Sequence, residues 1–281
     1  MTTWLITGCS TRLGRSLAEA VLAAGHNAIV TARDVSKVKD LAVQYPKTAY
    51  AAALNVTDKA QVADVVGETE KRFGSIDVLV NNAGYGYRAA VEEGDEQEVA
   101  DLFATNFFGT VSMIKAVLPG MRARRSGTIL NISSIAGRLA APGSGYYSAS
   151  KFAVGGMSDA LRKELAPLGI RVTIVEPGAF RTDFAGRSLQ QSKMKIDDYA
   201  ATAGPRRKEN DKTHGTQPGD PRRAAAALLE LVSRSELPAR LLLGSDAVKI
   251  VGNEVDGQRQ EIDAWKELSV SSDFASEGSN N

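Results

Sequence analysis

Short apolar runs alternate with longer segments of helical periodicity along most of this 281-residue chain. The runs lie at 4–6, 28–30, 49–54, 76–80, 128–132, 172–175 and 241–243. The helical patterns lie at 13–24, 59–73, 97–118, 147–166 and 221–232. Continuously apolar runs are typical of strands buried on both faces. The order of elements therefore predicts right-handed βαβ units in an α/β fold, a doubly wound parallel sheet flanked by helices.

No internal repeat and no domain linker is visible in the sequence, so we expect a single domain over residues 1–268. Residues 185–220 form a polar segment that glycine and proline interrupt, and it is too long for a plain connection. We expect this segment to be a substrate lid, with Arg206-Arg207-Lys208 solvated or, alternatively, in contact with an anionic substrate. The Ser- and Asn-rich residues 269–281 are expected to be a flexible tail.

Composition narrows the range of partners. A formal net charge of +1 argues against nucleic acid and membrane surfaces, and no apolar run approaches the roughly 18 residues of a membrane span. The single cysteine, Cys9, excludes an intrachain disulfide, and His26 and His214 do not form a ligand pattern. We therefore expect no metal. The N-terminus leads directly into an apolar run without a signal peptide, so we expect a cytoplasmic protein.

A glycine-containing turn joins the first predicted strand to the first predicted helix. Its sequence is Thr7-Gly8-Cys9-Ser10-Thr11-Arg12-Leu13-Gly14. Such turns let backbone N–H groups and a helix N-terminus approach a pyrophosphate, although an ordinary strand-to-helix turn is the alternative. The turn favours a dinucleotide-binding site.

The end of the second predicted strand bears on the choice of dinucleotide. An NAD enzyme usually places a carboxylate there, whereas this chain has Ala32 followed by Arg33. A guanidinium suits a 2′-phosphate because it donates charge-assisted, bidentate hydrogen bonds. Arg33 therefore favours NADP (NADPH) over NAD, the alternative being a surface arginine paired with Asp34.

Tyr147 and Lys151 are four residues apart in a predicted helix and so share one face. An ammonium beside a phenol favours the phenolate, which lowers the phenol pKa from about 10 toward a useful range for a general acid/base. A surface pair is the alternative for this common pattern.

Several segments together resemble the short-chain dehydrogenase/reductase family, over residues 3 to about 243. The glycine turn is similar to the family's Thr-Gly-x-x-x-Gly-x-Gly motif, with Arg12 in place of the middle glycine. Arg12 either crowds the phosphates or binds them. The segments that match other family motifs are Asn55-Val56-Thr57, Asn81-Asn82-Ala83-Gly84, Ser134 with Tyr147-x-x-x-Lys151, and Pro177-Gly178-x-x-x-Thr182.

The resemblance implies a Rossmann-type fold and two sets of site residues. The catalytic residues would be Asn106, Ser134, Tyr147 and Lys151; Ser134 precedes Tyr147 by the family's spacing of thirteen, which Ser133 does not. The cofactor would contact Thr7, Gly8, Ser10, Thr11, Arg12, Leu13, Arg33, Asn55, Val56, Asn82, Ala83, Gly84, Tyr147, Lys151, Pro177, Gly178, Ala179 and Thr182.

The implied activity is NADP-dependent hydride transfer to or from a carbonyl or alcohol substrate, as in an alcohol dehydrogenase or carbonyl reductase. Tyr85 and Tyr87 suggest a hydrophobic or ring-bearing substrate. The family also implies a homodimer or homotetramer packed through helices near 97–121 and 147–166. The alternatives are an NAD-linked enzyme and a dinucleotide-binding sensor that has lost catalysis, which only Arg12 supports.

Overall fold

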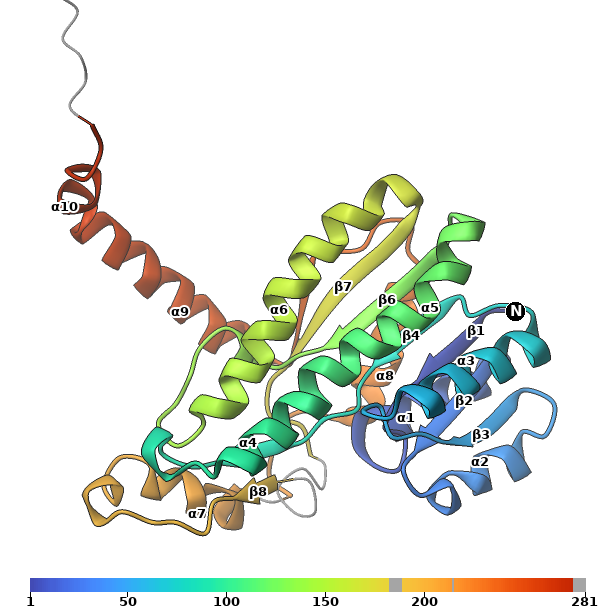
Figure 1. The fold of residues 1–281 in the computed structure, drawn as a ribbon, viewed down its shortest axis with the longest axis horizontal. Helices are drawn as coiled ribbons and strands as arrows, with labels where there is room; N and C mark the ends of the chain where they lie inside the picture. Colours follow the sequence, from blue (N-terminus) through green and yellow to red (C-terminus); the bar gives the residue numbers. More distant parts are fainter. Residues whose placement is uncertain (182–188, 214, 275–281) are drawn as a thin grey trace, which may run out of the picture.

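A seven-stranded parallel sheet forms the centre of the computed structural model, which describes residues 1–181, 189–213 and 215–274. The strand order is β3-β2-β1-β4-β6-β7-β9 (Figure 1). The strands are β1 (Thr3–Ile6), β2 (Asn27–Ala32), β3 (Ala49–Ala53), β4 (Val78–Asn81), β6 (Gly127–Ile132), β7 (Ile170–Pro177) and β9 (Arg240–Leu243). The order reverses between β1 and β4, as in a doubly wound sheet. The predicted fold class is therefore confirmed.

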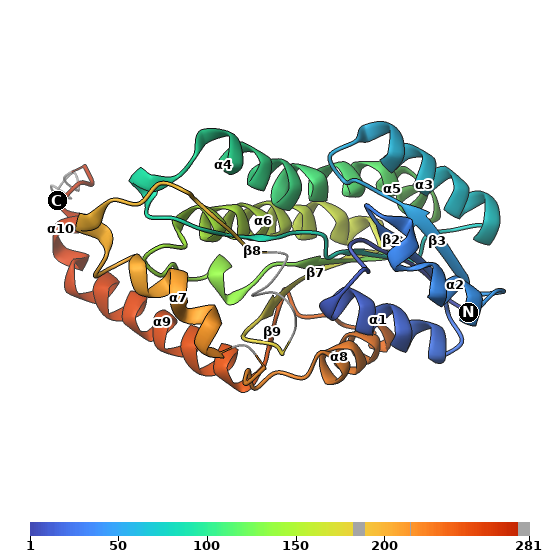
Figure 2. The ribbon, with the colours of Figure 1, turned by 90° about the horizontal axis from the view of Figure 1, so that it is seen from below.

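Helices cover both faces of the sheet, and each layer encloses its own apolar core (Figure 2). One layer contains α1 (Arg12–Ala23) and α8 (Pro221–Ser233), and the other contains α3 (Lys59–Phe73), α5 (Thr110–Arg124) and α6 (Gly145–Leu165). In the first core Leu17 and Leu228 are fully buried, and in the second Met113 and Ile129 are. Burying one such side chain stabilises the fold by about 1.5–3 kcal/mol.

Local sequence signals set the limits of α3, which begins and ends where the helical pattern predicts. Asp58 caps the start, because its side chain accepts hydrogen bonds from the amides of Ala60 and Gln61. Gly74 ends the helix with φ 81°, a left-handed conformation that glycine adopts without strain. Arg125 ends α5 in the same left-handed region, with φ 50°. Both turns lie at the amino edge of the sheet, before β4 and β6.

The helical pattern at 97–118 corresponds to three consecutive segments rather than one regular helix. These are α4 (Glu96–Phe103), a π-helical turn η3 (Ala104–Gly109) and α5. A π-turn inside a helix is often found at a functional site. Here the turn contains Asn106, which is 1% exposed.

Together these segments, Glu96–Arg124, form the one helix within the described residues that is long and apolar enough to cross a membrane. Its most apolar window has a mean hydropathy of 1.3 and is 39% buried. The sequence predicts no such segment, because charged residues interrupt the apolar run. Met113, Ile114 and Val117 pack against the sheet, as the residues of a core helix do.

Six further elements were not apparent from the sequence pattern. They are α2 (Lys39–Gln44), β5 (Gly86–Arg88), β8 (Leu189–Gln191), α7 (Gly204–Thr213), α9 (Ser245–Ala264) and α10 (Lys266–Val270). Strands β5 and β8 form a separate two-stranded parallel sheet. Helix α9 leaves the body of the molecule (Figure 1), and α10 extends to Val270, two residues into the predicted tail. Residues 185–188 and 214 of the predicted lid, and 275–281 of the tail, lie outside the described residues.

Candidate active site

Two adjoining cavities lie at the carboxyl edge of the sheet, where the loops after β1, β2, β4, β6 and β7 meet. The larger has a volume of about 320 Å³ and the smaller about 140 Å³. Both are lined by Asn82, Gly84 and Tyr85, so they form one continuous site. Predicted residues around the smaller cavity are Gly8, Ser10, Thr11, Arg33, Asn55, Val56, Asn82, Ala83 and Gly84. Those around the larger are Leu13, Asn82, Gly84, Ser134, Tyr147, Lys151, Pro177, Gly178 and Ala179.

The glycine turn is shaped to leave room and hydrogen-bond donors for an anion. Gly8 has φ 71°, and a Cβ there would lie 3.0 Å from Ala83 Cα. A Cβ on Gly14 would meet Asn82 Nδ2 and lie 2.6 Å from the Gly8 carbonyl oxygen. Thr11 is the N-cap of α1 but makes no side-chain capping hydrogen bond, and the first turn carries no acidic residue. The first amides of α1 are thus left to bind a phosphate group, so the turn fits a dinucleotide.

Arg12 is the first residue of α1 and so has right-handed helical dihedrals. Gly8, four residues earlier, supplies the left-handed conformation of this turn. The replacement of the family's middle glycine by Arg12 therefore introduces no left-handed strain. The predicted contact of the Arg12 side chain with phosphate lies outside the part of the chain that the structure describes.

Hydrogen bonds of the Asn82 and Thr7 side chains hold this turn against the end of β4. Asn82 Nδ2 donates to the carbonyl oxygens of Thr7 at 2.8 Å and Gly8 at 3.0 Å. Thr7 Oγ1 accepts hydrogen bonds from the amides of Asn82 and Ala83, both at 2.9 Å. Thr7 thus supports the cavity wall rather than lining it.

At the end of β2, Arg33 is exposed and lines the smaller cavity. The Asp34 carboxylate accepts a hydrogen bond from the Ser36 amide, which caps the 3₁₀ turn Val35–Lys37. The Ser36 side chain and then this amide hydrogen bond lower the Asp34 pKa. Among the ion pairs of the described residues none joins Arg33 to Asp34, so the alternative of a surface pair is wrong. Arg33 is placed to meet an anion at the mouth of this cavity.

Asn55 and Val56 form the opposite wall of the smaller cavity. Asn55 Oδ1 accepts hydrogen bonds from the amide of Thr57 at 3.2 Å and from its hydroxyl at 3.0 Å. The Asn55 side chain therefore holds its own turn. Val56 is 6% exposed and packs close to Gly109 of η3, where a Cβ would lie 2.5 Å from Val56 Cγ2.

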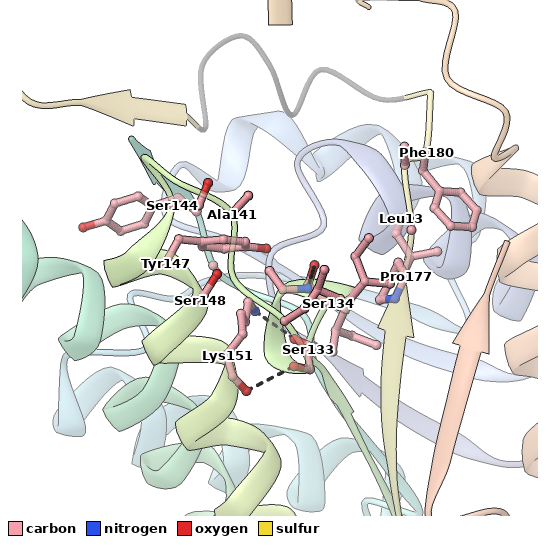
Figure 3. Close-up of a pocket in the computed structure, with 18 of the residues that line it drawn as sticks. Leu13, Ser133, Ser134, Ala141, Ser144, Tyr147, Ser148, Lys151, Pro177 and Phe180 are labelled. Carbon is pink, nitrogen blue, oxygen red and sulfur yellow. Dashed lines mark hydrogen bonds between the residues drawn. The ribbon is translucent and has the colours of Figure 1, made fainter. Parts of the chain in front are cut away.

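Tyr147 and Lys151 lie on the face of α6 that borders the larger cavity, and Ser134, after the end of β6, lines the same cavity (Figure 3). Lys151 is 6% exposed, and its ammonium donates to the Ile132 carbonyl oxygen at 2.9 Å. Lys151 Nζ lies 6.0 Å from the centre of the Tyr147 ring. Burial lowers the pKa of Lys151 to about 8. An ammonium whose pKa lies close to physiological pH therefore lies beside a buried phenol.

Contacts distinguish the predicted catalytic residues Ser134 and Tyr147 from their chain neighbours Ser133 and Tyr146. Ser133 Oγ donates to the Lys151 carbonyl oxygen at 3.2 Å, which uses its proton. Ser134 Oγ instead accepts from the Ala136 amide at 3.1 Å, which leaves its own proton to donate. Tyr146 donates to the Val91 carbonyl oxygen at 2.6 Å and is not a cavity residue. Ser134 thus keeps a hydroxyl proton to donate, and Tyr147, unlike Tyr146, lines the larger cavity.

Asn106 lies behind the cavity, in the π-turn. Its side chain accepts from the Tyr85 amide at 3.0 Å and donates to the Tyr85 carbonyl oxygen at 2.9 Å and to Ser150 Oγ at 3.1 Å. It therefore ties the segment after β4 to α6. A Cβ on Gly84 would lie 2.9 Å from Asn106 Oδ1 and 3.6 Å from Lys151 Nζ, so glycine is required for this approach.

The turn after β7 is held by a residue that the sequence did not indicate. Asp246, in the first turn of α9, accepts a hydrogen bond from the Ala179 amide at 2.7 Å. A Cβ on Gly178 would collide with the Asp246 carboxylate. Pro177, Gly178 and Ala179 line the larger cavity, while Thr182 lies outside the described residues. An aspartate after a glycine at a helix start was the available signal.

Glu93 fastens the segment that contains Ile196 and Arg207, part of the predicted lid, to the body of the molecule. Its carboxylate accepts hydrogen bonds from the amides of Ile196 and Ala90, both at 2.9 Å, and pairs with Arg207 of α7. Burial opposes the charged form, but these hydrogen bonds prevail and lower the pKa of Glu93 to about 2. Arg207 is 8% exposed, so its predicted solvation is wrong.

Two further predictions concern the tyrosines after β4 and the binding of metal ions. Tyr87 is fully buried and donates to Glu98 at 2.7 Å, so it does not line the cavity, whereas Tyr85 does. Among the described residues no group of three or more His, Cys, Asp or Glu could hold a metal ion.

The sheet order and the two adjoining cavities at its carboxyl edge define a doubly wound α/β domain of the dinucleotide-binding type. Residues 2–193 match the sequence model of the family described as short chain dehydrogenase. Oxidoreductase BOA17 of Botryotinia fuckeliana is 40% identical over 96% of this chain and 98% of its own length. The chain therefore belongs to the short-chain dehydrogenase/reductase family and is an oxidoreductase of that family.

Solved structures agree with this assignment. A short-chain dehydrogenase from Streptomyces avermitilis superposes with a TM-score of 0.91 at 42% identity, covering 97% of this chain and 99% of that chain. The closed form of a serine dehydrogenase complexed with NADP⁺ superposes with a TM-score of 0.74 at 26% identity, covering 86% of this chain and 94% of that chain.

Proposed function

We propose that this chain is an NADP-dependent oxidoreductase that transfers a hydride between the dinucleotide and a carbonyl or alcohol substrate. The observation that carries the proposal is the position of Tyr147. Its ring borders the larger cavity beside the buried Lys151 and Ser134, and the same cavity continues into the glycine turn. A proton donor, a charge that tunes it and a dinucleotide site are therefore adjacent.

Each residue has a role that follows from its contacts. In the direction of reduction, Tyr147 donates a proton to the oxygen that gains negative charge, and Ser134 donates a hydrogen bond to the same oxygen. Lys151, when charged, stabilises the phenolate that Tyr147 leaves behind, and it would bind the ribose hydroxyls of a bound dinucleotide. The Asn106 side chain is engaged by Tyr85 and Ser150, so it would hold the segment after β4 against α6 beside Lys151. The bound nicotinamide supplies or accepts the hydride.

The dinucleotide would extend along the whole cleft. The pyrophosphate would lie on the glycine turn and the N-terminus of α1, with the adenine against Asn55 and Val56 and the nicotinamide against Pro177, Gly178 and Ala179. Arg33 supports NADP over NAD, because no carboxylate occupies the end of β2 and the guanidinium borders the smaller cavity. The NADP⁺ complex of the serine dehydrogenase is consistent with this choice.

The test compares Tyr147→Phe with Tyr146→Phe, a matched change one residue away. NADPH oxidation is followed with a panel of ketones and aldehydes, and NADPH binding is followed by fluorescence. We expect Tyr147→Phe to lose turnover by at least about 1,000-fold while it binds NADPH, because the proton donor alone is removed. Tyr146→Phe should retain turnover.

Two outcomes would contradict the proposal. Normal turnover by Tyr147→Phe would remove Tyr147 from the mechanism. NADPH binding by the wild-type protein without turnover on any member of the panel would favour a dinucleotide sensor instead.

We also propose a cytoplasmic homodimer or homotetramer that packs through α4, α5 and α6. Two large apolar side chains support this assembly: Phe108 of η3, between α4 and α5, is 59% exposed, and Phe152 of α6 is 46% exposed. Phe108→Asp with Phe152→Asp should shift the mass measured by light scattering toward the monomer. An unchanged mass would exclude this interface.

A further inference from the structure

The outer half of α9 packs on nothing else among the described residues. Ala247 and Val251 are buried near the start of the helix, whereas every residue from 255 to 264 is exposed, and the helix projects away from the body (Figure 1). This outer half contains Gly257, which faces open space. A segment of about ten residues that includes a glycine is a marginal helix in water by itself. A contact outside this chain is therefore needed to stabilise it.

Apolar side chains recur every seven residues along the exposed side of α9. Val248, Val255 and Ile262 are 58%, 45% and 64% exposed. Trp265, which is 60% exposed, follows Ile262 by three residues, and the buried Val251 follows Val248 by three. This spacing gives the narrow seam of a coiled coil, not the wider stripe of a helix that packs on a body. β-branched residues at the first position of each repeat are typical of two parallel helices.

The charges beside this seam identify a second copy of the chain as the partner. Glu254 and Glu261 lie on one flank of the seam, and Arg259 and Lys266 lie on the other, each five positions after a glutamate. In two parallel helices in register, a residue of the first flank faces the residue five positions later on the other helix. Both pairs would then be of opposite charge, whereas antiparallel helices would bring like charges together. The pattern thus complements itself only when two copies are parallel.

The contacts that these charges already make are weak. Arg259 Nε donates to Asp263 at 3.0 Å, but the two side chains are 75% and 55% exposed. Glu254 accepts a hydrogen bond from Gln258 Nε2 at 2.9 Å, also on the surface. Exposed pairs of this kind contribute little to stability, and a guanidinium has donors for a second carboxylate. These contacts therefore do not oppose pairing across the seam.

A lipid surface is a poorer partner for the same seam. Residues 245–267 carry six carboxylates and three basic groups. The surface of a cytoplasmic membrane leaflet is anionic and attracts helices with an excess of lysine and arginine. The charge of α9 therefore favours a protein partner over a membrane.

We propose that α9 pairs in parallel with α9 of a second copy of this chain, so that a short coiled coil joins two subunits. Val255 and Ile262 would each meet their own copy, and Glu254 would pair with Arg259 of the other subunit. Gln258, the polar residue within the seam, would also meet its copy and so favour one register. The interface is separate from α4, α5 and α6 and does not rest on the proposed activity. Together the two interfaces would give a tetramer.

Disulfide trapping reads this contact directly in the full chain. The native cysteine, Cys9, is fully buried, so an introduced cysteine reports on its own position. The variants are Val255→Cys and Ile262→Cys in the seam, with Gln260→Cys as the control on the outer, exposed side of the helix. Under mild oxidation by copper phenanthroline, both seam variants should form covalent dimers at least about tenfold faster than the control, because only adjacent side chains can be bridged.

The assembly mass tests the same contact without an introduced thiol. In Ile262→Asp two carboxylates would face each other in the seam, so the dissociation constant should rise by at least about tenfold, while Gln260→Asp should leave it unchanged. Sedimentation over a range of concentrations measures the constant. The measurement is repeated in the variant with Phe108→Asp and Phe152→Asp, which removes the contribution of the other interface. Circular dichroism checks that each variant is folded.

A charge exchange tests the parallel orientation. Arg259→Glu would place carboxylates on both flanks and should weaken the association by about threefold or more. Adding Glu254→Arg to the same chain restores opposite charges across the seam and should restore the association. The single variant alone could act by losing its pair with Asp263, but that loss would not be repaired by the second change.

Three results would overturn the inference. The first is trapping of Val255→Cys and Ile262→Cys no faster than of Gln260→Cys, or trapping at only one of the two seam positions, as antiparallel helices would give. The second is an unchanged mass for Ile262→Asp. The third is binding of the wild type to vesicles of phosphatidylcholine and phosphatidylserine that Ile262→Asp abolishes, which would assign the seam to a lipid surface. Hydride transfer is tested separately, by turnover of the Tyr147 variant.

Discussion

Lys151 Nζ lies 6.0 Å from the centre of the Tyr147 ring and donates its described hydrogen bond to the Ile132 carbonyl oxygen. The ammonium is thus held by the backbone of the neighbouring strand, not by a carboxylate. Burial without an anionic partner is what lowers the Lys151 pKa to about 8. Since this pKa lies close to physiological pH, Lys151 is both a tuning charge and a group that titrates in the working range.

The first prediction concerns stability against pH. The Lys151 pKa falls from 10.5 in the unfolded chain to about 8 in the fold. Between these values the unfolded chain holds a proton that the folded chain has released, so Lys151 makes the free energy of unfolding rise with pH. The wild type should therefore gain roughly 3 kcal/mol relative to Lys151→Met between pH 7 and pH 10.5.

Urea unfolding at several pH values measures this difference, with Lys163→Met as the control at an exposed position of the same helix. The difference between Lys163→Met and the wild type should stay constant with pH. A constant difference for Lys151→Met would show that Lys151 is not desolvated. Reduction should also slow above about pH 8 in the wild type, because the charge that stabilises the phenolate is lost.

The second prediction concerns the choice of dinucleotide. Arg33→Ser removes the guanidinium at the smaller cavity, and charge-assisted hydrogen bonds contribute about 1.5–3 kcal/mol. The ratio of kcat/KM for NADPH to that for NADH should fall by about 10- to 100-fold, mainly through KM for NADPH. Arg122→Ser, an exposed arginine of α5, should leave the ratio unaltered. A wild-type ratio below one would reject the NADP assignment directly.

The third prediction concerns how residues 189–213, part of the predicted lid, are held to the body of the molecule. Glu93→Gln leaves Arg207 buried without its carboxylate, and breaking such a pair from one side costs about 3–5 kcal/mol. We expect a lower melting temperature and faster proteolysis of residues 189–213. Glu92→Gln is the matched control, because Glu92 is exposed and its carboxylate accepts a hydrogen bond from the Tyr199 hydroxyl. Equal protease resistance in both variants would show that Glu93 does not hold the lid.

The fourth prediction tests the close approach at Gly84. In Gly84→Ala the new methyl group would lie 2.9 Å from Asn106 Oδ1, so the π-turn or the segment after β4 must shift. Overpacking of this kind costs about 1–3 kcal/mol, and turnover should fall because Asn106 and Lys151 move. Gly67→Ala, on the open face of α3, should instead stabilise the protein by about 0.5–1 kcal/mol. Unfolding free energies and kcat for both variants decide whether the contact matters.

Strands and capped helices were predictable from the sequence because each follows from local chemistry. The α3 prediction matched because Asp58 and Gly74 mark its ends. The seven strands of the main sheet were predictable because they are short apolar runs. The inner strands β1, β2 and β4 are buried along their whole length, and the edge strands β3 and β9 are partly buried. The glycine turn and Tyr147 were found from the spacing of motifs, and both lie at the carboxyl edge of the sheet.

Elements that depend on distant partners could not be predicted in this way. The pairing of β5 with β8 joins residues about a hundred positions apart, and neither strand has an apolar run. Helix α9 lacks the usual apolar stripe because little of it packs on the body, so its sequence carries a weak periodic signal. The sequence did not predict the burial of Arg207, because a run of basic residues usually lies in solvent. The pairing with the buried carboxylate of Glu93, which explains the burial, cannot be read from the sequence.

The left-handed turns at Gly74 and Arg125 have a practical consequence. Both lie at the amino edge of the sheet, while the reactive groups come from loops at the other end of the same strands. A fluorophore or affinity handle placed beside Gly74 would therefore report on folding without entering the cleft. The amino edge of the sheet is therefore the place to attach a label, because the candidate active site lies at the carboxyl edge.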